Sequence, residues 1–143
     1  MRLLRKPKKE GLVKNVRKVV DNGITFDSRL EHFCYKQLLL NKIPFELKPT
    51  YTLVPKFTYM GENIRSLTLT PDFKLTSHGY IVDPKGLIQE VNNIKFKLLK
   101  AHLKENNESY KIVFLRNQGE VLNFINCLKT NTTYVPPKKK KKS

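Results

Sequence analysis

Acidic residues are scarce in this chain of 143 residues. Only 12 Asp and Glu stand against 28 Lys and Arg, which gives a formal net charge of +16. A positive field of this size concentrates DNA or RNA at the surface and makes binding sensitive to salt through counter-ion release. An anionic membrane surface would also be attracted, but no long stretch combines a bulky apolar face with a basic back. The charge therefore favours a nucleic acid as the partner.

Cysteines and long apolar runs are scarce too. Cys34 and Cys127 lie far apart and lack metal-ligand spacing, so we expect reduced thiols in a cytosolic protein, with a disulfide as the alternative. No apolar stretch approaches the roughly 20 residues that span a bilayer, and no signal-peptide core follows Met1 to Lys6. Gly-rich phosphate loops, zinc-ligand clusters and Ser-His-Asp arrangements are also missing from the sequence. We expect a cytoplasmic protein with no membrane partner.

The chain is long enough for one compact domain and too short for two ordinary ones. Residues 1–16 predict a basic, flexible N-terminal arm, and residues 131–143, which include Lys138 to Lys142, predict a Lys-rich flexible tail. The alternative for both ends is that the lysines only aid solubility. The folded domain is expected to span residues 17–130.

Local patterns predict the elements of this domain. Asn22-Gly23 predicts a tight hairpin turn, and Asp27-Ser28 predicts the start of a helix that runs to about Asn41. The further expected elements are strands at 45–53, 67–75 and 80–83, a helix at 92–104 with Ile94, Leu98, Leu99 and Leu103 on one side, a strand at 110–115 and a helix at 119–128. This order predicts an α/β fold with a mixed central β-sheet flanked by helices.

Two acids and a lysine flank the hairpin predicted at Gly79. Strand pairing would place Asp72 beside Asp83, and alternation would put Asp83 and Lys85 on the same face. Carboxylates held this close repel each other unless a cation lies between them, which indicates Mg²⁺, with Mn²⁺ as a substitute. Lys85 would orient the attacking water or stabilise the transition state of a phosphodiester hydrolysis. The alternative for each residue alone is a turn Asp or a solvated Lys.

A third acid, Glu31, stands three residues after Ser28. This spacing is typical of a capping box, in which the glutamate reaches back to the start of its own helix. Taken alone, the pattern favours that structural role over a catalytic one.

Together these motifs resemble the phage endonuclease I family of Holliday-junction resolvases and related small nucleases of the PD-(D/E)xK superfamily. The resemblance rests on residues 26–31, 36–38, 69–73 and 82–87, and it extends over about residues 18–115. It implies a restriction-endonuclease-like core and a metal-dependent endodeoxyribonuclease that resolves four-way DNA junctions in a phage-infected bacterium. It also implies a homodimer, with a domain-swapped arrangement as an open alternative.

The resemblance also implies roles for individual residues. The catalytic set would be Glu31, Asp72, Asp83 and Lys85. Asp72, Asp83 and the Pro84 carbonyl would share one metal ion, and Glu31 with Asp72 would hold a second. The chain departs from the family in having Asp83 where Glu is frequent, and in having Pro84 within a strand. Because proline lacks the backbone donor, Pro84 predicts an edge strand or a bulge.

A basic helix follows the motif. Its lysines would line a phosphate track or, equally, form an ordinary solvated face; they are Lys95, Lys97, Lys100 and Lys104. Two other functions stay open: a PD-(D/E)xK nuclease with another DNA target (nicking, replication or packaging), and a non-catalytic DNA-binding module of the same fold.

Overall fold

The computed structural model describes residues 18–85 and 90–137 of the chain. Its centre is a four-stranded sheet in the order β10-β9-β8-β3. The strands are β3 (Glu46–Leu47), β8 (Phe73–Leu75), β9 (Tyr80–Pro84) and β10 (Lys111–Leu115). β8 pairs antiparallel with β3 and β9, whereas β10 runs parallel to β9 after a helical crossover. The predicted mixed α/β sheet is therefore confirmed.

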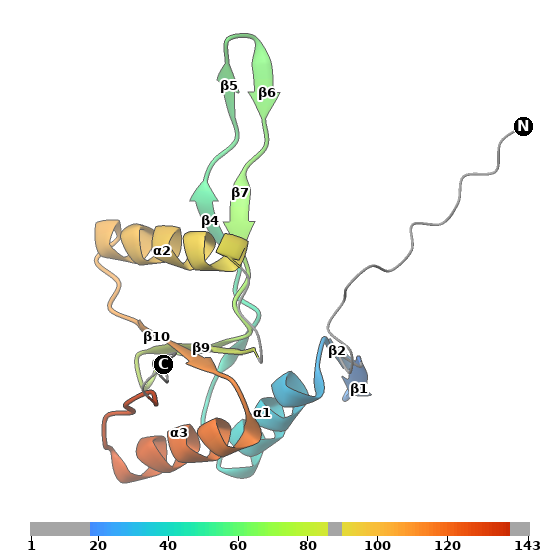
Figure 1. Cartoon of the computed structure of the whole chain (residues 1–143), viewed down its shortest axis with the longest axis vertical. Helices are drawn as coiled ribbons and strands as arrows, with labels where there is room; N and C mark the ends of the chain where they lie inside the picture. The colour runs from blue at the N-terminus through green and yellow to red at the C-terminus, as the bar shows by residue number, and fades with distance from the viewer. Residues whose placement is uncertain (1–17, 86–89, 138–143) are drawn as a thin grey trace, which may run out of the picture.

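Helices cover both faces of this sheet (Figure 1). They are α1 (Arg29–Leu40), α2 (Glu90–Glu105) and α3 (Gln118–Thr130). Because strand side chains alternate, Val82 and Val113 pack in a core with α1 and α3, whereas Ile81 and Ile112 belong to a second core with α2. Asp83 follows Val82, so its Cβ points to the same face as that of Ile81.

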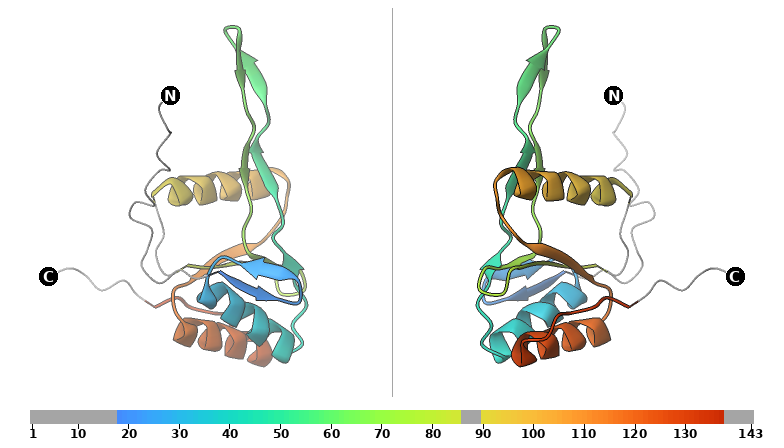
Figure 2. Two further views of the ribbon diagram at one scale, coloured as in Figure 1. Left: turned by 90° about the vertical axis from the view of Figure 1, so that its right-hand side faces the viewer. Right: turned by 90° about the vertical axis from the view of Figure 1, so that its left-hand side faces the viewer.

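The start of α1 is set by a short hairpin and a helix cap. β1 (Val19–Asp21) and β2 (Ile24–Phe26) pair antiparallel across Asn22-Gly23, both of which have positive φ, as a tight primed turn requires. Ser28 then caps α1 by accepting a hydrogen bond from the backbone N–H of Glu31. Both features were predicted. The hairpin lies next to α1 (Figure 2), and its second strand contacts this helix.

A long two-stranded arm projects past α2 (Figures 1 and 2). Its inner part pairs β4 (Tyr51–Val54) with β7 (Leu67–Leu69), and its outer part pairs β5 (Phe57–Tyr59) with β6 (Glu62–Ile64). The outer part was not predicted from the sequence. The available signal was Gly61 between two short runs of strand-forming residues, in a turn with Met60 also at positive φ.

Three predicted elements differ in detail. The single strand expected at 67–75 is divided into β7 and β8, which belong to different sheets, because the chain leaves the strand at Thr70 and Pro71 has no backbone N–H for a ladder. The single strand expected at 45–53 is divided into β3 and β4, because Lys48 has a positive φ of 49° and Pro49 follows it. In α2 the buried side chains are Phe96, Leu99 and Leu103, whereas Ile94 and Leu98 are exposed. The predicted apolar face was therefore partly wrong, because the helix turns the Phe96 side toward the sheet.

Packing also continues past the predicted end of the domain at residue 130. Tyr134 is buried against Phe124 of α3, with ring centroids 5.4 Å apart. The predicted arm (1–16) and Lys138 to Lys142 lie outside the described residues. Within the described ranges, no helix is long and apolar enough to cross a membrane.

Candidate active site

Asp72 and Asp83 lie side by side at one end of the β8–β9 hairpin. The register pairs Phe73 with Val82. Asp72, just before β8, and Asp83, in β9, therefore stand opposite each other at the next position of the hairpin. The backbone N–H of Asp72 donates to Asp83 Oδ1 at 3.2 Å, and both side chains are buried. The proximity predicted from the hairpin is therefore confirmed.

This acid pair is electrostatically strained. Burial, followed by the neighbouring Asp83 carboxyl, raises the pKa of Asp72 from its ordinary value of 3.8 to about 9. In the absence of a cation, two carboxylates this close share a proton rather than both ionise. The proton on Asp72 is therefore retained at neutral pH.

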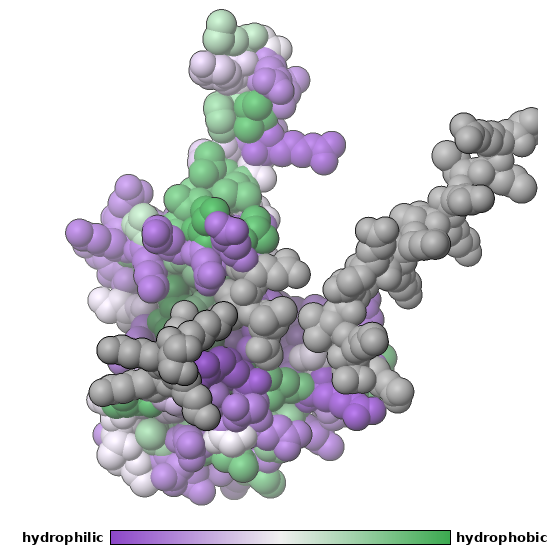
Figure 3. Space-filling view, in the orientation of Figure 1, coloured by the Kyte–Doolittle hydropathy of each residue, from purple (hydrophilic) through white to green (hydrophobic). Residues whose placement is uncertain are grey.

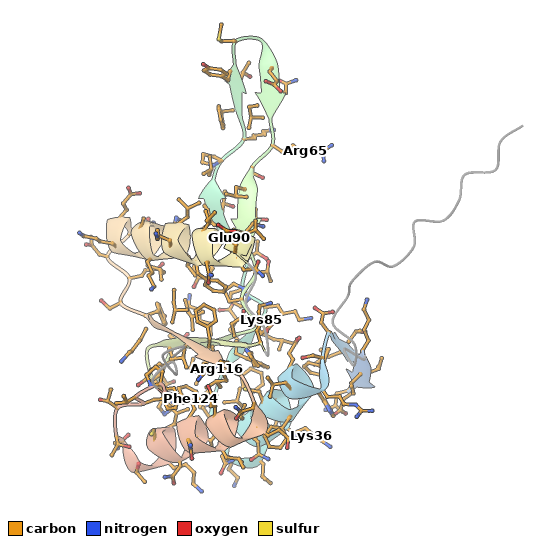
Figure 4. All side chains as sticks on the ribbon, viewed as in Figure 1. Lys36, Arg65, Lys85, Glu90, Arg116 and Phe124 are labelled. Atoms are coloured by element: carbon orange, nitrogen blue, oxygen red, sulfur yellow. The ribbon has the colours of Figure 1, made fainter. Side chains whose placement is uncertain are left out.

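Lys85 completes the group on the same strand. Its Nζ lies 3.5 Å from Asp83 Oδ2, in agreement with the predicted shared face. In Figure 4 its side chain lies between α2 and α1, at the level where β9 ends. The Lys85 side chain is about one-third exposed, so it remains accessible to a ligand while its Nζ lies beside Asp83.

Pro84 lies in a central strand, because β9 is flanked by β8 and β10. The predicted edge strand was therefore wrong, and so was the alternative of a bulge, because the pairing with β10 continues to Pro84 without a shift in register. Lys85 donates its backbone N–H to Leu115 of β10, so by alternation the nitrogen of Pro84 faces the β8 side. β8 pairing starts only at Phe73, opposite Val82, and no hydrogen bond of that ladder is lost at Pro84.

Glu31 reaches this site from α1 within one chain. One of its oxygens, Oε2, accepts a hydrogen bond from the backbone N–H of Asp27 at 3.2 Å, which is close to the predicted capping role. The other oxygen, Oε1, is buried and accepts no hydrogen bond from any described residue. Burial raises the pKa of Glu31. The positive charge of Lys48 opposes this rise, whereas the negative charge of Asp83 adds to it. Exchange of elements between two chains is not needed to bring Glu31 here.

The start of α3 provides an internal comparison. Glu120 stands three residues after the cap Asn117, as Glu31 does after Ser28, and it is equally buried. Both Glu120 oxygens are bound, by the Nε of Arg116 and the amide of Asn117. Glu120 is therefore explained by capping and ion pairing, whereas capping accounts for only one oxygen of Glu31.

Lys48 is the site residue that the sequence analysis missed. Its backbone N–H donates to the carbonyl of Asp72 at 2.9 Å, and its Nζ lies 3.6 Å from Glu31 Oε1. The only signal in the sequence is its place before Pro49, which does not distinguish it from other loop lysines.

The two carboxylates offer oxygen donors of the kind that a hard divalent cation takes. Asp83 Oδ2 is buried and without a hydrogen-bond partner in the described structure, and the Asp72 carboxyl lies beside it. However, no group of three or more His, Cys, Asp or Glu in the described ranges is arranged to hold a metal ion. The metal roles of Glu31, Asp72, Asp83 and Pro84 therefore all stay predictions.

The α2 lysines do not form a single track. Lys97, Lys100 and Lys104 are exposed and recur at helical spacing on one side. Lys95 is half-buried, and at 100° per residue it falls on the opposite flank of the buried stripe. The predicted four-lysine surface is therefore reduced to three.

Fold and site together define a mixed α/β domain with a buried acid pair, a facing lysine and a helix-borne glutamate at the end of a central strand. Residues 13–119 match the family described as "Protein of unknown function (DUF1064)", and the chain belongs to this family. No curated protein and no solved structure matches the chain.

Proposed function

We propose that this protein is a Mg²⁺-dependent endodeoxyribonuclease with a PD-(D/E)xK core, and that it resolves four-way DNA junctions. The observation that carries the proposal is the contact between Asp72 and Asp83, with Asp83 Oδ2 accepting no hydrogen bond from the described residues and lying 3.5 Å from the Lys85 ammonium. Burying two acids without a cation is unfavourable, and function is the usual reason for keeping such a pair.

The order of elements supports the same class of nuclease. A helix with an acid precedes an antiparallel hairpin, and a crossover helix then leads to a strand parallel to the second hairpin strand. Asp72, Asp83 and the Pro84 carbonyl would hold the ion. Bound Mg²⁺ would coordinate a phosphate oxygen and lower the pKa of its attacking water.

The chain's own residues would arrange the reaction. Lys85 would stabilise negative charge that develops on the phosphate, because its ammonium faces the acid pair from the solvent side. The exposed Lys97, Lys100 and Lys104 would contact neighbouring phosphates without reading sequence. A homodimer in the cytoplasm of a phage-infected bacterium would provide two such sites for paired cuts.

The test is cleavage of a labelled immobile four-way junction and of matched linear duplex, with and without Mg²⁺. We expect Mg²⁺-dependent paired nicks in the junction, and a loss of about 100-fold or more in Lys85→Met. The control is Lys42→Met, which removes an exposed lysine in the turn after α1, past the opposite end of the helix from Glu31. Equal cutting of the linear duplex would reassign the target, and equal activity of Lys85→Met would contradict the proposed site.

A second candidate is a non-catalytic DNA-binding module of the same fold. It is favoured by one observation, the lack of a three-ligand metal group among the described residues. Tight junction binding with no cutting in Mg²⁺ or Mn²⁺ would select this function.

A further inference from the structure

Lys48 is held in place by three contacts. Its backbone N–H binds the Asp72 carbonyl at 2.9 Å, its Nζ binds the carbonyl of Thr25 at 3.2 Å, and the same Nζ lies 3.6 Å from Glu31 Oε1. Its φ of 49° is uncommon for a lysine. This conformation lets the backbone face Asp72 while the side chain turns to α1. Lys48 thus joins the acid pair to Glu31.

Lys48 and Lys85 each lie next to a different acid of the site. Lys85 lies 3.5 Å from Asp83, and Lys48 lies 3.6 Å from Glu31. With all five groups ionised, Glu31, Asp72 and Asp83 carry three negative charges against two positive ones. One divalent ion and one phosphate charge then bring the site to neutrality. A second divalent ion would leave two uncompensated positive charges in a buried place.

A cation at Glu31 would also meet Lys48 directly. An ion bound to Oε1 at the usual distance of about 2.1 Å would lie next to the lysine ammonium. Repulsion between these charges acts at short range, because Glu31 is only 3% exposed and holds the ion in place, although the Lys48 side chain is itself about one-third exposed. The ammonium of Lys48 therefore supplies the positive charge next to Glu31 that a second metal ion would otherwise supply.

We propose that Lys48 is a built-in counter-ion of Glu31, so that each chain binds one divalent cation, at Asp72 and Asp83, and not two. This inference rests on the proposed metal-dependent function. Lys48 acts as a positioning residue: it fixes the free oxygen of Glu31 and limits the metal count.

The experiment counts Mn²⁺ ions bound per chain by titration calorimetry and by electron paramagnetic resonance of free Mn²⁺. The unaltered chain should bind one ion, and Asp83→Asn should bind none. Lys48→Met and Lys48→Gln should bind two, whereas Lys48→Arg and the exposed control Lys42→Met should keep one. Circular dichroism shows whether each variant is folded. Two neutral variants, Lys48→Met and Lys48→Gln, are used so that the test stands if one of them does not fold.

The outcomes separate this inference from the proposed function. Two ions on the unaltered chain would overturn the counter-ion role yet leave the nuclease proposal intact. One ion on both folded neutral variants would also overturn it, because Lys48 would then not exclude the second ion. No Mn²⁺ uptake by the unaltered chain would contradict the metal-dependent function itself.

Discussion

At the scale of single residues, the main feature is a pair of buried acids that the fold brings together at an energetic cost. Asp72 and Asp83 lie at the end of a hairpin whose other paired side chains are apolar or aromatic, with the exception of Lys74. Water is excluded around them, so the ionised form of Asp72 is disfavoured and its pKa is raised to about 9. A metal ion would convert this unfavourable pair into a binding site.

The raised pKa predicts how stability depends on pH. Between about pH 4 and pH 9 the metal-free folded chain keeps a proton on Asp72 that the unfolded chain releases. The unfolded state binds fewer protons, so the free energy of unfolding falls as pH rises through this window. Asp72→Asn mimics the protonated form and should raise Tm at pH 8 by roughly 4 °C per kcal/mol recovered.

Thermal unfolding in a chelator at pH 3 and pH 8 checks this prediction. The two proteins should differ little at pH 3, where Asp72 is protonated in both states. Added Mn²⁺ should stabilise the unaltered chain at pH 8 but not Asp72→Asn. Equal Tm values at pH 8 in chelator would show that the acid pair is not strained.

At the scale of elements, two helices begin in the same way but use their glutamates differently. In α1 and α3 a glutamate at the third position reaches back to the chain before the cap. Glu120 has both oxygens satisfied by its own helix start. Glu31 leaves one buried oxygen toward Lys48 and the acid pair.

This contrast gives a matched pair of variants, because glutamine can also serve in a capping box. Glu31→Gln should keep the fold but reduce Mg²⁺-dependent cutting by about 10- to 100-fold or more, as expected for loss of a charged group at a metal site. Glu120→Gln should weaken the contact with Arg116 and lower Tm, while the cutting rate of the folded protein is unchanged. Cleavage assays and thermal unfolding measure the two effects. Equal loss of activity in both variants would mean that Glu31 is only a cap.

At the scale of the whole molecule, charge and shape are decided by different parts of the chain. The formal charge of +16 is spread along the sequence, and five lysines stand at 138–142. The folded part adds an exposed set on α2 and an arm that carries Phe57, Tyr59 and Met60 into solvent. Figure 3 shows apolar surface where the foot of the arm meets α2.

The charge predicts a steep dependence of DNA binding on salt. Each phosphate contact contributes about 0.9 to the slope of log affinity against log salt concentration. Replacing the five lysines at 138–142 by serine should therefore reduce the slope by up to about 4.5. Serine at Lys97, Lys100 and Lys104 should reduce it by up to about 2.7 if α2 also faces DNA. Fluorescence anisotropy at several salt concentrations measures both slopes; an unchanged slope in both variants would exclude these lysines from the interface.

Local sequence patterns were sufficient for the features that depend on neighbouring residues. The Asn22-Gly23 turn, the Ser28 cap and the approach of Asp72 to Asp83 follow from backbone preferences, capping chemistry and strand pairing, all of which act over short distances. The order of helices and strands also indicated the mixed sheet.

Only the tertiary structure decided which residues complete the site. Lys48 comes from a loop whose role depends on contacts with α1 and with the chain before β8, and Glu31 is distinguished from an ordinary cap by one oxygen. The buried side of α2 likewise depends on the sheet against which it packs. Local preferences depend on neighbouring residues. Burial and charge pairing arise only when segments that are distant in the sequence pack against each other and displace water from between them.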